Sequence, residues 1–317
     1  MAAPKPRPRP YEIVIPVFDD EENLVNLLDS LADVGVSPCD VIVSMSGPKG
    51  NIDKLKASYG FRLLYSENRQ GPSATRNKGA GETTADYIMF LDSDVLVSKQ
   101  WKVALDEITE EKSVLLAGDT VHVSATPNWL ERFWFSQMER GERKYINSAN
   151  VLVRQDLFQD LGGFNEKLDS GEDYDFSIRS AAYGAPPVFD KRLKVFHEGY
   201  PKSVMEFLKR ERWHASGDLG SIKAFMASRV MLAATLYVLI SLTVLATLIT
   251  ANWSVFLPAA LAFLFFPLGL TLYKLGWDGK STVLSYLIMN FYLAGRGSAL
   301  IGLLSRPLAR AFNLSRI

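Results

Sequence analysis

The chain has 317 residues, and its 35 lysines and arginines balance 35 aspartates and glutamates, so its formal net charge is zero. This length suffices for one large α/β domain or two smaller ones. A neutral chain gives no electrostatic reason to bind nucleic acid, and we expect no nucleic-acid partner. A single cysteine, Cys39, excludes an intrachain disulfide and suits a reducing compartment.

Residues 3–10 (APKPRPRP) alternate proline with basic side chains and contain no apolar core. This pattern predicts an extended, polyproline-like tail over residues 1–10 and differs from a secretory signal peptide. The domain that follows, over residues 11–202, is therefore expected to stay in the cytoplasm.

Strand and helix signals alternate along this domain. Apolar, β-branched runs predict strands, helical spacing such as that of Leu24, Leu27 and Leu28 predicts helices, and the unalternating YIMFL run predicts a strand buried on both faces. The predicted strands are residues 12–17, 40–43, 61–65 and Tyr87–Leu91, and the predicted helices are Glu21–Asp33, 51–59 and 71–81. Such alternation predicts a parallel, Rossmann-like sheet that binds its ligand beyond the carboxyl ends of the strands.

The remainder of the domain has weaker signals. We expect helices at residues 129–140 and Glu172–Ala182, and a strand at residues 146–153. Residues 203–228 mix apolar and basic side chains, which predicts an amphipathic helix at a membrane surface; an ordinary helix packed on the domain is equally compatible.

Two long uncharged stretches follow, of 21 residues at 230–250 and 20 residues at 254–273. Each would form a helix about 30 Å long, which matches the hydrocarbon core of a bilayer. A buried hairpin of a soluble protein is the alternative, but core helices seldom stay apolar on all sides over this length. We predict two transmembrane helices within residues 229–274.

A third apolar segment lies within residues 282–317. Arg296 near its middle would be costly in lipid, so we favour an interfacial or re-entrant segment over a third span. Two spans also keep Lys274, Lys280 and the arginines of the tail on one side with the N-terminal domain. The expected location is therefore a multi-pass membrane protein with that domain in the cytoplasm.

Two carboxylates, Asp92 and Asp94, come directly after the YIMFL run. Side chains two residues apart in an extended segment point the same way, and a pair of carboxylates suits a hard divalent ion such as Mg²⁺ or Mn²⁺. Asp-x-Asp is also a frequent pattern in solvated turns, but its position after a buried strand favours a metal site.

Two further segments carry polar groups. In NRQGPSATRNKG, residues 68–79, a Gly-Pro turn leads into a helix whose first amides favour anions, with Arg76 about one turn inside. The Gly-Lys-Ser/Thr ending of a P-loop is absent. In the segment Ser170-Gly171-Glu172-Asp173, Ser170 and Asp173 have the spacing of a capping box, and Asp173 equally suits a base that accepts a proton from a hydroxyl.

Taken in order, these segments resemble an inverting family 2 glycosyltransferase with a GT-A fold, over about residues 11–218. The resemblance rests on IVIPVFDDEENL, GPSATRNKGA, DYIMFLDSD, GGFNEKLDSGEDYDFSIR and KRERW. It implies an α/β fold class: a GT-A, Rossmann-like nucleotide-sugar-binding domain followed by a C-terminal transmembrane helical region.

The resemblance also implies roles for individual residues. Asp92 and Asp94 would bind the divalent metal, Mg²⁺ or Mn²⁺, with His197 as a further ligand. Asp173 would be the catalytic base, with Glu172 beside it. The residues implied in binding the nucleotide-sugar donor are Pro16, Phe18, Asp20, Ser44, Arg76, Asp92, Arg212 and Trp213.

The chain departs from the family pattern in two places. Many relatives have Asp-Asp-Gly-Ser after the second strand, where this chain has Ser44-Met45-Ser46-Gly47, so base recognition must differ. Lys209 replaces the glutamine of a Gln-x-x-Arg-Trp motif, which favours transfer of a single sugar over processive synthesis.

The function implied is transfer of a sugar from a nucleotide-sugar donor to a lipid-linked or membrane-proximal acceptor, in glycolipid or polysaccharide synthesis, with membrane lipid as a further partner. Two alternatives stay open: a polyprenyl-phosphate sugar synthase, and a non-catalytic nucleotide-sugar-binding scaffold at the membrane.

Overall fold

The computed structural model describes residues 9–119, 121–124, 126–138, 145–168 and 170–311. The chain forms two compact units: Met1–Thr126 with Glu139–Tyr200, and Pro127–Met138 with Pro201–Ile317. Most of the predicted tail, residues 1–8, lies outside the described residues. The segment Pro127–Met138, which the sequence assigned to the α/β domain, belongs to the second unit.

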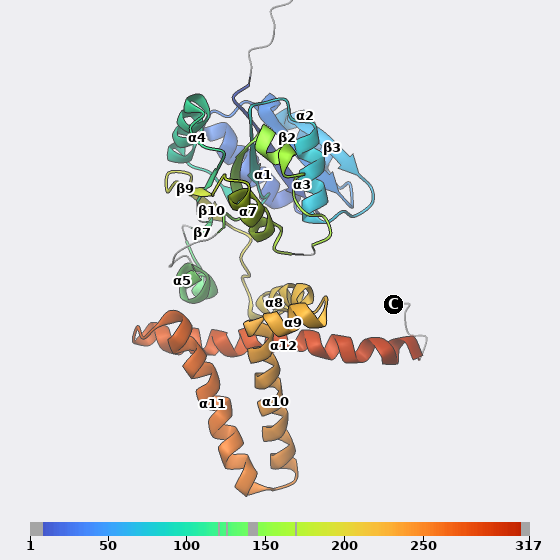
Figure 1. Cartoon of the computed structure of the whole chain (residues 1–317), viewed down its shortest axis with the longest axis vertical. Coiled ribbons are helices and arrows are strands. Elements are labelled where there is room, and N and C mark those ends of the chain that lie inside the picture. Colours follow the sequence, from blue (N-terminus) through green and yellow to red (C-terminus); the bar gives the residue numbers. More distant parts are fainter. Residues whose placement is uncertain (1–8, 120, 125, 139–144, 169, 312–317) are drawn as a thin grey trace, which may run out of the picture. The chain divides into compact units, whose positions relative to one another are not determined.

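A sheet forms the centre of the first unit (Figure 1). It is mixed and seven-stranded, with its strands in the order β3-β2-β1-β4-β8-β6-β9. The strands are β1 (Tyr11–Val17), β2 (Val41–Ser46), β3 (Arg62–Ser66), β4 (Tyr87–Leu91), β6 (Leu116–Gly118), β8 (Asn150–Arg154) and β9 (Val188–Phe189). The first four neighbours pair in parallel, as predicted, whereas β8 runs antiparallel to β4 and β6. A smaller sheet, β5 (Val95–Leu96), β10 (Val195–His197) and β7 (Val121–Val123), lies beside it.

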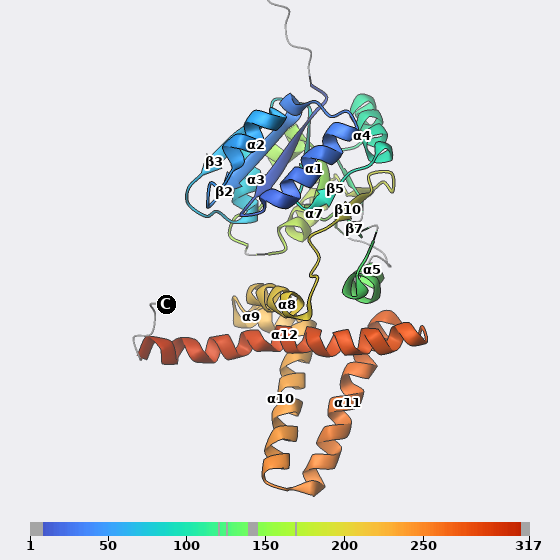
Figure 2. The same ribbon diagram turned by 180° about the vertical axis from the view of Figure 1, so that it is seen from behind.

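Helices cover both faces of the large sheet because side chains of each strand alternate between two apolar cores (Figure 2). Ile13 and Ile15 of β1 point into one core, and Val14 points into the other. The first core also takes α1 (Glu21–Asp33), α2 (Ile52–Tyr59) and α4 (Lys99–Glu111); the second takes α3 (Pro72–Gly81), α6 (Gln155–Asp160) and α7 (Glu172–Ala182).

The prediction that Tyr87–Leu91 is buried on both faces is confirmed, since all five side chains of β4 are 0% exposed. The helices at Glu21–Asp33 and Glu172–Ala182 also have the predicted ends. The strand predicted at residues 146–153 begins only at Asn150, because the residues before it form a turn.

The second unit contains a helical hairpin, α10 (Arg229–Ile249) and α11 (Trp253–Leu275) (Figure 1). These are the two helices of the described residues that are long and apolar enough to cross a membrane, with mean hydropathies of 2.3 and 2.2. Only 17% and 11% of their most apolar windows are buried, whereas a core helix of a soluble protein is mostly buried. The hairpin falls where the sequence predicted two spans.

The other elements of this unit are η2 (Glu131–Phe135), α5 (Ser136–Met138), α8 (Val204–Asp218), α9 (Ile222–Ala227) and α12 (Lys280–Ala311). The helix predicted at residues 129–140 is partly a π-helical turn, and its last two residues lie outside the described part of the chain. The single amphipathic helix predicted at 203–228 is broken into α8 and α9 by the turn at Gly220.

The third apolar segment forms α12, which runs across the end of the hairpin rather than alongside it (Figures 1 and 2). Arg296, the arginine expected to be costly in lipid, is only 14% exposed on this helix. Arg296 Nε donates to Glu211 Oε2 at 3.0 Å, and Nη1 donates to Asp218 Oδ2 at 3.1 Å, both on α8. At Gly295 the two helices approach so closely that an added Cβ would lie 3.2 Å from the carbonyl oxygen of Leu208. Two charge-assisted hydrogen bonds therefore fix α12 along α8.

Candidate active site

The predicted site residues of the first unit gather at the carboxyl ends of β1 and β4. The chain passes from β1 through α1 to β2, which pairs with one edge of β1. Strand β4 pairs with the other edge of β1. This is the point where strand order reverses, and ligands of open α/β sheets bind in the crevice outside it.

Asp20 and Ser93 tie together the two loops that leave these strands. Ser93 Oγ donates to Asp20 Oδ2 at 2.6 Å, and Asn23 Nδ2 donates to Asp20 Oδ1 at 2.8 Å. Asp20 therefore fixes the Asp92-Ser93-Asp94 segment through its middle residue, which leaves the flanking carboxylates for other partners.

His197 is brought to Asp94 by the small sheet. Because β5 follows Asp94 directly and pairs antiparallel with β10, Val95 lies opposite His197. The His197 Nε2 atom is 3.4 Å from Asp94 Oδ2, and the Glu198 amide donates to the Asp94 carbonyl at 2.7 Å.

Gly199 is a site residue that the sequence reasoning missed. A Cβ at this position would lie 1.8 Å from Asp94 Oδ2, so the backbone of Gly199 lies directly against the carboxylate. The glycine in VFHEG was the only available signal. Any larger residue here would displace Asp94.

Asp94 has a charge environment that suits a cation. Burial, reinforced by the negative charges of Asp92 and Asp20, raises the pKa of Asp94 to about 7. Its Oδ1 is buried with no hydrogen-bond partner. The described residues contain no ready cluster of three or more His, Cys, Asp or Glu side chains for a metal. A carboxylate oxygen that lacks a hydrogen-bond donor can bind a hard divalent ion. The remaining ligands of that ion would be donor phosphate or water.

Arg76 joins the two acidic motifs. Its side chain is 4% exposed; Nη2 donates to Asp92 Oδ1 at 2.5 Å and Nη1 donates to Glu172 Oε1 at 2.9 Å. Ser148 Oγ, another residue that sequence reasoning missed, donates to the same Glu172 oxygen at 3.2 Å. In the structure each of the two Nη atoms of Arg76 donates to a carboxylate, so Arg76 positions both of them; its predicted contact with the donor stays a prediction.

Asp173 lies in the first turn of α7. The helix starts after Gly171, whose φ is +84°, and no side chain caps it, so of the two alternatives left open for this segment the capping box of Ser170 and Asp173 is not formed. Burial, together with the charge of Glu172, raises the pKa of Asp173 to about 6, against hydrogen bonds from the Tyr174 and Ser148 amides. A carboxylate with such a pKa is suited to act as a general base near neutral pH.

Residues 12–167 match the family model "Glycosyl transferase family 2", and residues 118–275 match "Glycosyl transferase family group 2". The chain belongs to glycosyltransferase family 2. It is 29% identical to the pre-mycofactocin glycosyltransferase of Mycobacterium tuberculosis over 61% of this chain and 43% of that protein. It is 27% identical to glycosyltransferase AglE of Haloferax volcanii over 69% of this chain and 75% of that protein. The chain therefore spans less than half the length of the first of these relatives.

The fold of this family 2 glycosyltransferase is also that of a solved enzyme. The mannosyltransferase PcManGT of Pyrobaculum calidifontis, in complex with GDP-Man and Mn²⁺, superposes with a TM-score of 0.56 over 94% of this chain and 89% of that one, at 13% identity. The likeness confirms the predicted GT-A fold.

Phe18 directly follows β1 in the candidate active site of the glycosyltransferase. Its ring is 41% exposed, and the guanidinium carbon of Arg69 lies 4.3 Å from the ring centroid. Gly47 has a φ of +96°, and a Cβ there would lie 2.7 Å from the Phe18 ring. Sequence reasoning missed Arg69 because its contact with the Phe18 ring depends on how the loops after β1 and β3 come together.

Pro16 and Ser44 lie within strands β1 and β2 rather than in the loops after them, and Pro16 is partly exposed. They are partners in the pairing of β1 with β2. Ser44 is 0% exposed, which gives it no surface for a donor, so we leave it out of the donor site. The chain after β2 becomes exposed only at Pro48, since Gly47 is still buried.

Arg212 and Trp213 belong to α8 in the second unit. Trp213 is 49% exposed, and the Arg212 guanidinium lies against Gly302 of α12. Their contact with the donor stays a prediction.

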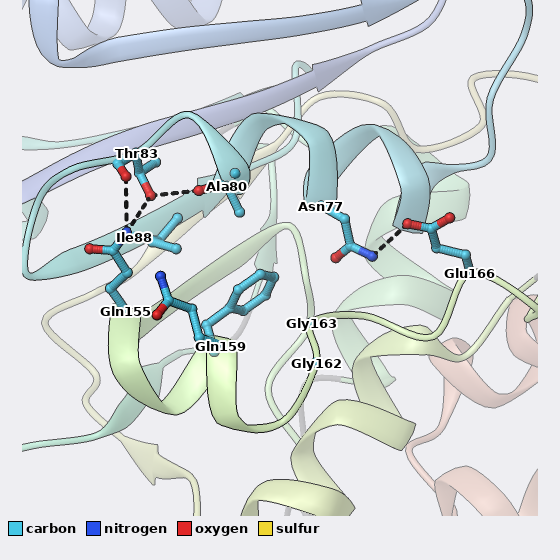
Figure 3. A pocket seen from close by; sticks show the side chains of 11 residues that line it. Asn77, Ala80, Thr83, Ile88, Gln155, Gln159, Gly162, Gly163 and Glu166 are labelled. Atoms are coloured by element: carbon cyan, nitrogen blue, oxygen red, sulfur yellow. Dashed lines mark hydrogen bonds between the residues drawn. The ribbon is translucent and has the colours of Figure 1, made fainter.

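A separate cavity of about 410 Å³ lies between α3 and α6 (Figure 3). Asn77 Nδ2 donates to Glu166 Oε1 at 2.9 Å at one end, and Gln155 Nε2 donates to the Thr83 carbonyl at 2.9 Å at the other. None of the predicted site residues lines it, so it is distinct from the crevice of the glycosyltransferase.

Proposed function

We propose that this family 2 glycosyltransferase is a membrane-anchored, inverting enzyme that transfers a sugar from a nucleotide-sugar donor to a lipid-linked or membrane-proximal acceptor. The observation that carries the proposal is the bridge from Asp92 through Arg76 to Glu172. This bridge connects Asp92, in the motif expected to bind the donor, to Glu172, the neighbour of the proposed base Asp173. The complex of PcManGT with GDP-Man and Mn²⁺ supports a nucleotide-sugar donor and a divalent metal.

A divalent cation, Mg²⁺ or Mn²⁺, held by Asp92 and Asp94 would supply positive charge for the leaving nucleoside diphosphate. His197 is close enough to Asp94 to act as a further ligand or to orient that carboxylate. The unpartnered Oδ1 of Asp94 is the atom best placed to gain from such an ion.

Asp173 accepts the proton of the acceptor hydroxyl. The hydroxyl oxygen attacks the anomeric carbon from the face opposite the diphosphate, the bond from that carbon to the diphosphate oxygen breaks, and the configuration inverts. Arg76 and Ser148 hold Glu172, which keeps the first turn of α7 in place. A positioned base contributes about a hundredfold to ten-thousandfold in rate.

Membrane anchoring is supported by the second unit. Leu242, Leu245 and Leu261 are among many exposed apolar side chains on the hairpin, at 56%, 54% and 46% exposure. Arg229 begins α10 and Lys274 lies in the last turn of α11, whereas the connection at residues 250–252 has no charge. Positive charges at one end only favour that end on the cytoplasmic side.

The test uses the full chain in nanodiscs. A thermal-shift screen of UDP-, GDP- and dTDP-sugars with Mn²⁺ identifies the donor, because a ligand that binds the native state raises its Tm. Asp173→Asn should keep the donor-induced rise in Tm and lose transfer. Asp175→Asn, on the same helix and paired with Arg179 at 2.7 Å, is the matched control and should keep transfer.

Near-wild-type transfer by Asp173→Asn would contradict the assignment of the base. Binding of a donor without transfer to any acceptor lipid, by the wild type, would favour the non-catalytic scaffold instead.

A further inference from the structure

We propose that Lys274, held over the rings of Trp134 and Tyr292 at the end of α11, binds the phosphate group of a membrane lipid. The inference rests on the proposed membrane anchoring and assigns a phosphate-binding site in the second unit.

The site has a rigid aromatic floor. Trp134 and Tyr292 are 1% and 8% exposed, and their ring centroids are 4.9 Å apart. Phe207 of α8 packs edge-on against Trp134, with centroids 6.0 Å apart. Ser285 Oγ of α12 donates to the Phe133 carbonyl at 2.9 Å, which fixes the segment carrying Trp134.

Lys274 places its ammonium group on this floor. The Nζ atom is 4.7 Å from the centroid of Trp134 and 5.0 Å from that of Tyr292, and the residue is exposed. Attraction to two ring faces holds the cation in one place. An ammonium has three N–H donors, so donors not directed at the rings remain for an anion.

The two carboxylates of α8 beside this floor, Glu211 and Asp218, accept hydrogen bonds from arginines. Arg296 also lies over Tyr292, at 5.4 Å, but Glu211 and Asp218 both accept from it. Arg210 Nη1 donates to the other oxygen of Glu211 at 3.0 Å. No ion pair reaches Lys274 within the described ranges of the chain. Two arginines thus engage these two carboxylates, and the ammonium of Lys274 adds a further positive charge to this cluster.

The position of Lys274 identifies the class of anion. It lies in the last turn of an apolar helix of 23 residues, beside Tyr273 and near Trp277, which are 86% and 76% exposed. Exposed aromatic residues at the end of a span are typical of the level of the lipid headgroups. The anion available at that level is the phosphate of a lipid, either a bulk phospholipid or a lipid-phosphate acceptor.

The experiment measures retention of radiolabelled lipid by immobilised full-length protein in phosphatidylcholine mixed micelles. The two probes are a long-chain polyprenyl monophosphate and phosphatidic acid. Lys274→Gln should retain about tenfold less lipid, the loss of one charge-assisted hydrogen bond. Lys280→Gln, at the start of α12, is the matched control and should retain as much as the wild type; Lys274→Arg should restore most of the retention.

Loss of the polyprenyl probe alone would support the site and identify the acceptor as its source, and equal loss of both probes would support a general phospholipid site. Unchanged retention by Lys274→Gln, or an equal loss in Lys280→Gln, would overturn the proposal. Resistance of the wild type to carbonate extraction tests membrane anchoring separately, and the donor-induced Tm rise of each variant tests its fold and its donor site.

Discussion

Arg76 on α3 donates a hydrogen bond of 2.9 Å to Glu172, the first residue of α7 and 96 residues later in the chain. The same guanidinium donates to Asp92 at the end of β4. Its planar fork can serve two carboxylates at fixed angles, which an ammonium cannot. The distance between the two acidic motifs is therefore set by one buried side chain.

Replacing Arg76 should damage both stability and transfer. Arg76→Gln leaves Asp92 and Glu172 without their shared cation, and removing one partner of a buried ion pair costs about 3–5 kcal/mol. Partial exposure of Asp92 and Glu172, at 29% and 14%, places the loss at the lower end. We expect kcat to fall about a hundredfold, because small displacements of reacting groups have effects of this size. Urea unfolding and steady-state transfer measure the two effects.

The control for Arg76 is Arg62→Gln. Arg62 pairs with Glu12, which is fully buried, away from the crevice. This variant should lose stability but keep its kcat at temperatures where it is folded. Equal kcat values for Arg76→Gln and Arg62→Gln would mean that the bridge has no role in transfer.

The elements that the sequence predicted are those with a local signal. Local signals in residues 11–91, namely apolar β-branched runs, helical spacing and a Gly-Pro helix start, are enough to place β1 to β4 and α1 to α3. The same spacing is present in Trp101, Ala104, Leu105 and Ile108, with Ser98 as cap, so α4 was predictable and was missed. The reversed direction of β8 was not predictable, because strand direction is set by distant connections.

The residues of the candidate site also divide into those with a local sequence signal and those without one. Asp92, Asp94, Glu172 and Asp173 stand in short motifs that are visible in the sequence. Ser148, Gly199 and Arg69 act through contacts with residues far away in the chain, which no local pattern encodes. The capping box at Ser170, one of two alternatives that the local pattern left open, is not formed, because the left-handed backbone of Gly171 starts the helix instead.

Transfer should depend on the ionisation of Asp173. Its pKa, raised from 3.8 to about 6, places the acid limb of kcat/KM near pH 6, with activity rising as the carboxylate forms. The stability contributed by this residue has the opposite trend. It is fully present below the unfolded pKa and is lost as pH rises through about 6, because the fold disfavours the charged form.

The Glu172→Gln variant tests whether the ionisation of Asp173 produces the acid limb of the kcat/KM profile. Removing the neighbouring negative charge should lower the pKa of Asp173 and move the limb to lower pH. Saturating Mn²⁺ in every buffer keeps the titration of Asp94 out of the profile. A limb that stays in place in Glu172→Gln would assign it to another group.

Gly171 and Gly184 bracket α7 and form a matched pair. Both have positive φ, +84° and +94°, and a Cβ at either position meets nothing within 4 Å. Alanine at each should therefore cost about 1–2 kcal/mol of stability through backbone strain alone. Only Gly171→Ala should also lower kcat, because it precedes Glu172 and Asp173. Thermal unfolding and transfer assays on both variants check this, and similar kcat values would rule out a catalytic effect of the turn.

Gly199→Ala should weaken metal binding. The added methyl would lie 1.8 Å from Asp94 Oδ2, so the carboxylate or the backbone after β10 must move. Since Asp94 is a proposed ligand, we expect the Kd for Mn²⁺ to rise about tenfold or more, comparable to the effect of losing a residue that orients a ligand. Titration of Mn²⁺ followed by electron paramagnetic resonance measures it directly. Gly81→Ala, where a Cβ meets nothing within 4 Å and φ is negative, is the control and should bind Mn²⁺ as the wild type does. If Gly199→Ala binds Mn²⁺ with unchanged affinity, Asp94 is not a ligand of the metal in this enzyme.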